Sequence, residues 1–331
     1  MVQPTPAAAP GQTPGTSDAA QGMNVKARTQ TQLVIRRFLR HRGAIAGMAL
    51  LFFVIALAVT SIGAGPIPGW WDKNHIGTAD LVNGGRPTLG LWPGFLGGGG
   101  VHLGEHPFGQ DNIGRDYFAV VMRGTQVSLV IAVIVGVVAT AVGTVIGAVA
   151  GYFRGAAEAT LMRATDLMIT IPTLLFAAMV AVMWGNQNIV TLGLVLGAVT
   201  WTQTARLVRG EVLALREKEF VEAARSVGTS AARIIFKHLL PNVIGIIVVS
   251  VTLAISSAIL LESALSFLGL GVQAPDTSLG KIINEYRTAM MTRPWLFYWP
   301  GAFIIATALS INFIGDGLRD AFDPRQNRVR A

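Results

Sequence analysis

Long uncharged apolar runs alternate along this chain with shorter segments that carry nearly all of its charges. A helix that crosses a membrane needs roughly 20 predominantly apolar residues, so each uncharged run of that length predicts one span. The six predicted spans lie at 44–62, in the gap 124–153, in the two halves of 167–205, at 241–265 and in the gap 294–315. The turn sequence Gly185-Asn186-Gln187-Asn188 divides the long run, and Pro241 suits the first position of a helix. The fold class is therefore an all-α integral membrane protein with six transmembrane helices.

Lysine and arginine are distributed unevenly over the segments between these spans. The N-terminal segment, the second loop, the fourth loop and the C-terminal tail together hold 19 of the 26, and the segments on the opposite side hold the other seven. Loops rich in Lys and Arg stay in the cytoplasm, so both termini are predicted to be cytoplasmic. The net charge of +8 mostly expresses this bias, and we do not interpret it as nucleic-acid binding.

The polar segments divide the chain into parts of different character. These parts are a disordered tail (1–25), a basic amphipathic juxtamembrane segment (26–43), the first span (44–63), an external loop (64–122), a core with the other five spans (123–320) that contains a polar loop (206–240), and a cytoplasmic C-terminal tail (321–331). The N-terminal tail is rich in Pro, Ala, Gly, Thr and Gln, a composition that cannot bury a core. The basic segment fits the lipid of the inner membrane surface, or it serves the topology alone.

Composition supports the membrane class and excludes several kinds of site. Hydrophobic residues make up 52% of the 331 positions and charged residues 13%, against about 25% charged in soluble domains. The chain has no cysteine, which excludes disulfides and thiolate metal sites. Gly280-Lys281 does not end a phosphate-binding loop, because Pro275 stands where that loop needs its first glycine. We expect no catalytic centre, metal or cofactor in this chain, so ATP and Mg²⁺ would be bound by another chain.

The polar loop between the predicted fourth and fifth spans contains a charged, helix-forming segment, Glu222-Ala223-Ala224-Arg225-Ser226-Val227-Gly228. Its glycine can close the helix in a left-handed conformation, and Ser230 can cap a second helix that leads through Leu240-Pro241 into the fifth span. The two alanines are small, so another surface can approach the first helix closely. An amphipathic helix seated in a groove is a common mode of recognition. The alternative is an ordinary solvated loop with salt-bridged helices.

This segment resembles the coupling motif of ABC-importer permeases, in which Glu-Ala-Ala is followed by Gly and then by an apolar residue before Leu-Pro. His238 departs from that motif. Three further blocks extend the likeness, over residues 30–325, to the C-type permease subunits of dipeptide and oligopeptide importers. They are His106-Pro107-Phe108-Gly109-Gln110-Asp111-Asn112-Ile113-Gly114-Arg115-Asp116, Ala264-Leu265-Ser266-Phe267-Leu268-Gly269-Leu270-Gly271, and Gly315-Asp316-Gly317-Leu318-Arg319-Asp320 with Asp323-Pro324 behind it.

The resemblance implies the fold of a type I ABC-importer permease, with a cytoplasmic coupling helix between spans 4 and 5, in a bacterial plasma membrane. The partners it implies are a homologous second permease that forms a heterodimer with this chain, two ATPase subunits that bind ATP and Mg²⁺, and an external substrate-binding protein. Closure of the ATPases would rock the permeases between inward-facing and outward-facing states. The implied ATPase-coupling residues are Glu222, Ala223, Ala224, Arg225, Gly228, Leu240 and Pro241.

The substrate implied by the resemblance is a dipeptide or oligopeptide, although related importers also move nickel chelates and other small solutes. Two other classes of protein stay open. A self-contained channel or secondary transporter would need the repeated intramembrane ionisable residues of an ion relay, which these spans lack. A membrane scaffold would need no cavity, but this class does not explain the predicted kink in the third span.

The block before the second span is predicted to form part of an external vestibule, or else to brace the loop against the helices. Its candidate residues are His106, Pro107, Phe108, Gly109, Asp111, Gly114, Arg115 and Asp116. Pro172 predicts a kink in the third span, which serves either as a gate element or as a tolerated irregularity. Glu262 is the clearest ionisable residue inside a span. It either lines the translocation path or is a hydrogen-bonded structural carboxyl.

Two patterns concern packing. Gly143, Gly147 and Gly151 form a face on which helix backbones can approach closely, either within this chain or against a partner permease. Arg163 and Asp166 stand three residues apart near the inner end of the third span, and this spacing predicts a local ion pair.

Overall fold

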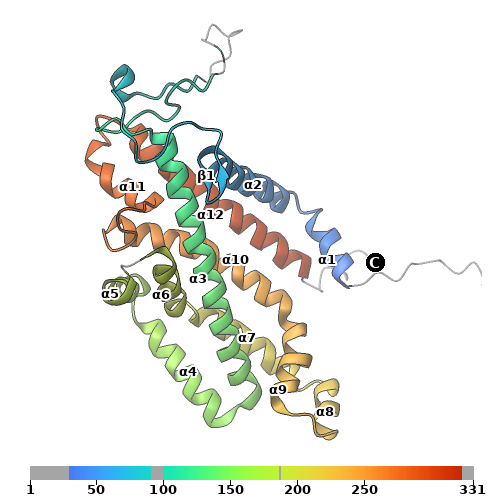
Figure 1. Ribbon diagram of the computed structural model, residues 1–331. Coiled ribbons are helices and arrows are strands. Elements are labelled where there is room, and N and C mark those ends of the chain that lie inside the picture. The colour runs from blue at the N-terminus through green and yellow to red at the C-terminus, as the bar shows by residue number, and fades with distance from the viewer. Residues whose placement is uncertain (1–29, 91–99, 101, 186–187, 323–331) are drawn as a thin grey trace, which may run out of the picture.

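A computed structural model describes residues 30–90, 100, 102–185 and 188–322, which form a mostly helical molecule (Figure 1). The predicted N-terminal tail 1–25 lies outside the described residues. So do most of the C-terminal tail and residues 186 and 187 of the predicted turn.

Within the described ranges, four helices are long and apolar enough to cross a membrane. They are α2 (Arg42–Ile62), α3 (Tyr117–Phe153), α10 (Leu240–Phe267) and α12 (Trp295–Phe322). Helix α3 runs through the centre of Figure 1 and is flanked by α6 (Ile189–Val199), α7 (Thr202–Leu215) and α10. Its 37 residues correspond to about 55 Å, so it extends beyond an apolar layer of about 30 Å. The first, second, fifth and sixth predicted spans therefore have long helices.

The predicted third and fourth spans are broken into shorter helices. The pieces are α4 (Gly155–Thr170), α5 (Thr173–Val180), the π-turn η3 (Ala181–Gly185), α6 (Ile189–Val199) and α7 (Thr202–Leu215). The chain bends by 93° between α4 and the α5–η3 segment, at Pro172, so the predicted kink is a sharp break. By length and composition the described residues supply four spans, or five if the bent pair is one span. The predicted count of six is not reached on this criterion.

Helix α4 begins at Gly155, twelve residues before the uncharged run from which the third span was predicted. Its two acidic residues pair with arginines of helix α7. The Asp166 carboxylate accepts from Arg206 at 2.5 Å, and the Glu158 carboxylate accepts from Arg209 Nε at 2.9 Å. The predicted pair of Arg163 with Asp166 is therefore wrong, because Asp166 faces α7 rather than its own helix.

The polar loop folds as predicted into two helices, α8 (Glu219–Ser226) and α9 (Ala231–Arg233). Helix α9 continues through the π-turn η4 (Ile234–Leu239) into α10, so the fifth span does not begin at Pro241. A proline inside a helix lacks the N–H donor and crowds the preceding turn. The wider π-turn accommodates it, and the Asn242 side chain donates to the His238 carbonyl at 2.6 Å.

The predicted external loop contains little regular structure and ends at residue 116, because α3 already begins at Tyr117. It contains a two-stranded antiparallel ladder, β1 (Gly63–Ala64) with β2 (Ile67–Pro68), and the 3₁₀ turn η1 (Val82–Gly85). The short helix α11 (Leu279–Tyr286) and the turn η5 (Arg287–Ala289) lie at the same end of the molecule, and α8 lies at the far end of α3 (Figure 1). The basic helix α1 (Gln30–Phe38) packs against α12.

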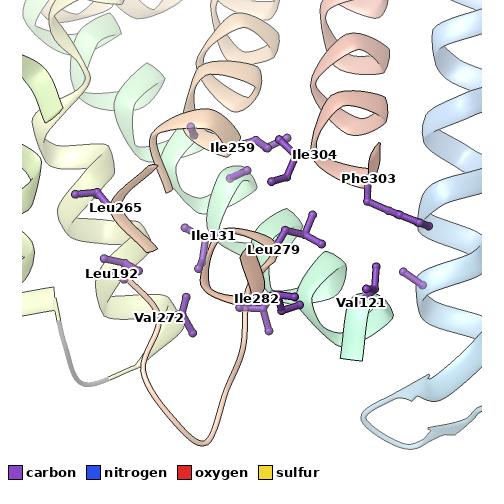
Figure 2. Packing of buried hydrophobic residues seen from close by; sticks show 14 of the residues in the cluster. Val121, Ile131, Leu192, Ile259, Leu265, Val272, Leu279, Ile282, Phe303 and Ile304 are labelled. Atoms are coloured by element: carbon purple, nitrogen blue, oxygen red, sulfur yellow. The ribbon is translucent and has the colours of Figure 1, made fainter. Parts of the chain in front are cut away.

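The main core lies where α3 meets α10, α11 and α12 (Figure 2). Ile131, Ile259, Leu279 and Ile282 are almost fully buried there, and each such side chain contributes about 1.5–3 kcal/mol on burial. This core holds the loop 268–278 and helix α11 against the N-terminal half of α3.

The glycine face of α3 packs inside this chain. A Cβ atom on Gly143 would lie 2.7 Å from the Trp201 carbonyl oxygen, and one on Gly147 would lie 2.4 Å from the Ala205 carbonyl oxygen. Gly151 lies against Val212 in the same way. Contacts this close are possible only for glycine, so the α3–α7 interface is intramolecular at these positions. The prediction of internal packing is confirmed.

Candidate functional site

Helix α8 presents one face to its own chain and one face outward. Val221 and Ala224 are buried, whereas Glu222, Ala223 and Val227 are exposed. The three-residue spacing of the buried positions follows from the 3.6-residue turn of a helix. Only one of the two alanines therefore remains on the face that another surface can approach, and Ala224 instead lets α8 lie close to its own molecule.

The inward face of α8 belongs to a second hydrophobic cluster, which we call the α8 cluster. Its buried members are Ala148, Val208, Val212, Val221, Ala224, Ile234, Ile235, Leu239 and Val243. They come from α3, α7, α8, η4 and α10. Arg225 adds a cation–π contact, with its guanidinium 5.2 Å from the centre of the Tyr152 ring. The inward face of α8 thus packs mainly on η4, within a cluster that also contains residues of α3, α7 and α10.

The turn after α8 depends on Gly228. Its φ of +74° lies in the left-handed region, where a residue with a Cβ is strained by roughly 1–2 kcal/mol. The Thr229 amide donates to the Ala224 carbonyl at 3.1 Å, and the Gly228 amide donates to the Arg225 carbonyl at 2.9 Å. Ser230 stands at the N-cap position of α9 as predicted, but its hydroxyl makes no capping hydrogen bond.

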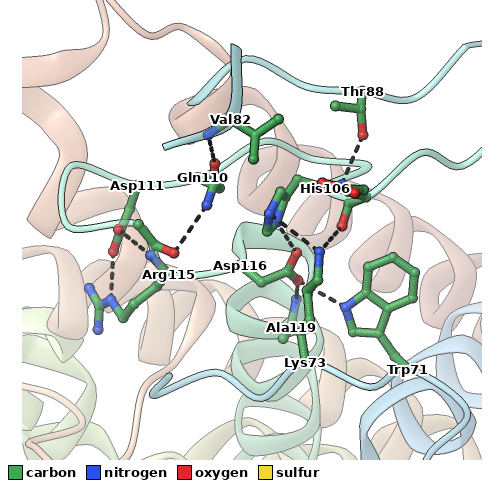
Figure 3. A network of polar contacts seen from close by, with 12 residues as sticks. Trp71, Lys73, Val82, Thr88, His106, Gln110, Asp111, Arg115, Asp116 and Ala119 are labelled. Carbon is green, nitrogen blue, oxygen red and sulfur yellow. Dashed lines mark hydrogen bonds and ion pairs between the residues drawn. The ribbon is translucent and has the colours of Figure 1, made fainter. Parts of the chain in front are cut away.

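The block 106–116 is a buried polar network at the opposite end of α3 (Figure 3). Asp116 caps α3 by accepting from the Ala119 amide at 2.8 Å, and it also accepts from Trp71 Nε1 at 3.1 Å. His106 Nδ1 lies 2.7 Å from the second Asp116 oxygen, and Lys73 Nζ lies 3.3 Å from His106 Nε2. A lysine ammonium can only donate, so Nε2 accepts and Nδ1–H donates to Asp116.

A second group of polar side chains ties the block to α11. Arg115 Nε donates to Asp111 at 2.5 Å, and Tyr286 donates its hydroxyl proton to the same carboxylate at 2.8 Å. Burial and the neighbouring Asp111 charge raise the pKa of Tyr286, so this hydroxyl stays protonated. Burial lowers the pKa of Arg115, but the hydrogen bond to Asp111 and the electrostatic effect of Tyr286 outweigh it and leave that pKa raised.

Apolar and backbone contacts complete the block. The Phe108 ring stacks on Trp299 of α12 with centroids 3.9 Å apart, and Pro107 is buried beside it. Gly109 and Gly114 both have a φ of +85°, and a Cβ on Gly114 would lie 1.8 Å from the Ala79 carbonyl oxygen. This is the geometry of a brace between the loop and the helices. Asn112 and Ile113 are exposed, so a vestibule surface at this block is limited to its tip.

Glu262 has the surroundings of a structural carboxyl. It is fully buried and accepts from Ser128 of α3 at 2.9 Å and from Ser266 of its own helix at 2.6 Å. Ser128 Oγ in turn accepts from the Leu279 amide at 3.2 Å. This group of hydrogen bonds joins α3, α10 and the start of α11.

A cavity of about 510 Å³ opens beside the break at Pro172. Its lining is contributed by α3, by α4 and α5 on either side of the break, by α6 and α7, and by one face of α10. The lining residues are Val135, Met168, Ile169, Ile171, Thr173, Phe176, Val199, Thr200, Thr202, Gln203, Thr204, Leu207, Ser250, Leu253, Ala254, Ser257, Ala258 and Leu261. Neither Pro172 nor Glu262 is among them.

The predicted residues thus form two assemblies at opposite ends of α3, and sequence reasoning missed several of their partners. Trp71, Tyr286 and Trp299 hold the block 106–116 from distant parts of the chain. No spacing in the sequence indicates these pairings. The polar positions lining the cavity were also missed, although the recurrence of Ser250 and Ser257 seven residues apart was a readable signal for one helix face.

Comparison with known proteins gives consistent similarities over nearly the whole chain. Residues 143–328 match the family described as binding-protein-dependent transport system inner membrane component. Residues 29–68 match the N-terminal transmembrane domain of oligopeptide transport permease C.

Curated relatives are similar over almost their full length. The oligopeptide transport system permease protein OppC of Salmonella typhimurium is 38% identical over 306 residues, which cover 92% of this chain and 95% of the relative. The protein of the same name from Haemophilus influenzae is 34% identical over 309 residues, with 93% of each chain covered. The one from Mycobacterium tuberculosis is 36% identical over 301 residues, with 90% and 96% covered.

Proposed function

This chain belongs to the family of inner-membrane components of binding-protein-dependent transport systems, and we propose that it is the permease subunit of an ABC importer of oligopeptides. The proposal is supported by the relatives, whose names describe permease proteins of oligopeptide transport systems. The observation that carries it in this chain is the outward face of α8, an exposed acidic helix anchored from behind by the α8 cluster.

The partners of this permease are a second, homologous permease, two ATPase subunits that bind ATP and Mg²⁺, and an external substrate-binding protein. The exposed face of α8, with Glu222 and Ala223, docks into a groove of one ATPase. Val221 and Ala224 share the α8 cluster with residues of α3, α7 and α10, and η4, which α8 contacts, continues into α10. Movement of the docked helix therefore moves this cluster and the helices that contribute to it. Helices α7 and α10 also line the cavity, so ATP-driven motion changes its access. Hydrolysis itself takes place in the partner chains.

The arrangement in the membrane follows from the distribution of basic residues. The end of the molecule with α8 and both termini faces the cytoplasm, and the loop 63–116 with α11 faces outward. The bent α4–α5 pair and the α6–α7 pair provide the third and fourth of six crossings. The two carboxylates of α4 enter this arrangement as ion pairs with α7, which lowers the cost of placing them near the membrane.

Co-purification tests the class of machine. The tagged chain is purified from native membranes in mild detergent, and its companions are identified by mass spectrometry. We expect a second permease and two P-loop ATPases. Recovery of the chain alone, under conditions that preserve other membrane complexes, would instead support an autonomous transporter.

Charge reversal tests the docking helix. In the Glu222→Lys variant we expect ATP-dependent peptide uptake to fall by at least about tenfold, because a buried or desolvated acidic contact to the ATPase becomes repulsive. The chain should still insert into the membrane, since Glu222 is exposed and lies outside the α8 cluster. The Glu211→Lys variant is the matched control, because Glu211 is exposed on the neighbouring helix α7. Normal uptake by the Glu222→Lys variant would disprove the assignment.

A further inference from the structure

Among the residues that the structure describes, those lining the cavity beside Pro172 include no ionisable group. All of its 18 lining residues are apolar or carry a hydroxyl or a carboxamide. Asp166 and Arg206, which lie on the helices α4 and α7 that line the cavity, are paired with each other at 2.5 Å. A fixed charge in such a low-dielectric site would attract one sign of substrate and repel the other. Its absence means that the wall discriminates little between acidic, basic and neutral solutes.

The polar groups of this wall have unused hydrogen-bonding capacity. Ser250 is 4% exposed, and its Oγ has no hydrogen-bond partner among the described residues. Buried polar atoms in folded proteins are almost always paired, so an unpaired hydroxyl in a cavity wall indicates a partner that is not part of this chain. The side chains of Gln203 and Ser257 also make no hydrogen bond within the described part of the chain, and both are exposed in the cavity.

These groups lie along a strip that follows the axis of α10. Ser250, Leu253, Ala254, Ser257 and Leu261 follow one face of α10 over three turns, and Gln203 faces them from α7. Hydroxyl groups recur along this strip at Ser250 and Ser257, with apolar residues between them. An extended peptide offers polar groups at regular intervals as well, because each residue has one N–H and one C=O group whatever its side chain is. Hydroxyls and carboxamides can both donate and accept, so they can pair with either backbone group.

We propose that Gln203, Ser250 and Ser257 bind the backbone of a peptide in transit, and that this uncharged strip makes the passage insensitive to side-chain charge. The inference rests on the proposed function, since it names how the same permease handles its substrate. Selection among peptides then takes place before the cavity. All three hydrogen-bonding residues of the strip belong to this chain. A partner permease would complete the passage around the strip but would not supply these groups.

Uptake by the complete transporter in proteoliposomes tests the proposal. ATP, binding protein and peptide are saturating, so that the maximal rate reports transfer through the membrane rather than capture. Three probes differ in one side chain: Ala-Ala-Ala, Ala-Glu-Ala and Ala-Lys-Ala. We expect the wild-type maximal rates to agree within about threefold. The Gln203→Leu and Ser250→Ala variants should lower all three rates together, by about two- to tenfold for each lost hydrogen bond.

Introduced charges give the sharper readout. The Ser257→Asp variant should slow Ala-Glu-Ala relative to Ala-Lys-Ala by about tenfold, and the Ser257→Lys variant should reverse this preference. The Thr170→Val variant is the matched control for loss of a hydroxyl, because Thr170 is exposed on α4 but does not line the cavity. It should leave all three rates unchanged.

Each alternative outcome has a distinct meaning. If the wild-type complex imports none of the peptides, the proposed function fails. If it imports them but the Ser257 variants show no charge preference and Gln203→Leu keeps full rates, the peptide-binding strip is disproved while the importer stands. If the variants lose the second permease during purification, the cavity is an interface between permeases, and the assignment is overturned.

Discussion

Asp116 shows at the scale of single residues how one carboxylate can organise a loop. It accepts hydrogen bonds from the Ala119 amide, from Trp71 Nε1 and from His106, and is 2% exposed. The helix cap, an aromatic side chain of the loop and the start of the block are thereby held at one point. Truncation of the Asp116 side chain would leave these buried donors without an acceptor. An unpaired buried donor costs more stability than the loss of a hydrogen bond in which both partners are removed.

We therefore expect the Asp116→Ala variant to be destabilised by about 3 kcal/mol, from the lost cap and the unpaired donors. The Asp116→Asn variant retains a capping oxygen and should lose less. The measurement is the thermal unfolding of purified protein in detergent, followed by tryptophan fluorescence. Glu105→Ala is the control, since Glu105 is exposed next to the block and should change little. An unfolding temperature of Asp116→Ala equal to that of the control would refute the bracing role.

Residue types and spacing predicted that this block is structured, but they did not predict which residues it contacts. A cluster with Gly, Pro and charges before the second span indicated a structured segment. The contacts to Trp71 and Tyr286 join positions that are 45 and 175 residues away in sequence. Such pairings depend on the path of the whole chain, which local pattern does not contain. For Gly228 the local rule was sufficient, because a helix end with a left-handed residue requires glycine whatever lies elsewhere.

At the scale of elements, the central feature is the close contact of α3 with α7. Its basis is the row Gly143, Gly147 and Gly151, where the backbone of α7 occupies the space of a side chain. The sequence predicted a face for close packing but could not name the partner helix. It also misplaced the start of α4, because a rule based on uncharged gaps cannot recognise charges that another helix neutralises.

The Gly147→Ala variant should disrupt this contact. The new methyl group would lie 2.4 Å from the Ala205 carbonyl oxygen and 3.0 Å from the Arg209 amide nitrogen, and backbone atoms can yield only if the helices separate. We expect a loss of about 1–3 kcal/mol in stability, as for other overpacked sites. Unfolding temperature and the yield of the intact complex are the readouts.

Gly210→Ala is the matched control for the same substitution in the partner helix. Gly210 lies in α7, and no atom lies within 4 Å of the position of a new methyl group. Alanine favours a helix over glycine by about 1 kcal/mol, so this variant should be neutral or slightly more stable. If both variants were equally tolerant, the close packing of α3 on α7 would not describe the protein in the membrane.

At the scale of the whole molecule, two working surfaces lie at opposite ends of α3. The α8 helix at one end and the braced loop at the other are both fixed to the same few long helices, and the cavity lies between those helices. Basic residues concentrate on alternate loops, which predicts that these two surfaces lie on opposite sides of the membrane, and this orientation stays a prediction. The number of crossings is harder to read, since α4–α5 and α6–α7 are broken in places where apolar composition continues.

The absence of cysteine from the sequence makes the crossings directly measurable, because any single introduced cysteine is the only thiol. We choose exposed positions after each proposed crossing: Ile113→Cys, Ala156→Cys, Asn188→Cys and Val227→Cys. Between the first and the last lie α3, the α4–α5 pair and the α6–α7 pair. Three crossings place these two positions on opposite sides of the membrane, with Asn188 outside and Ala156 inside.

We expect a membrane-impermeant maleimide to label the Ile113→Cys and Asn188→Cys variants in intact spheroplasts. The Ala156→Cys and Val227→Cys variants should react only after the membrane is permeabilised, and the cysteine-free parent provides the background. A bent pair that re-enters on the same side would leave Asn188→Cys protected. Protection of Ile113→Cys together with external labelling of Val227→Cys would invert the whole molecule. The 93° bend at Pro172 makes Asn188 the decisive position, because its side of the membrane decides whether α4 and α5 form one crossing.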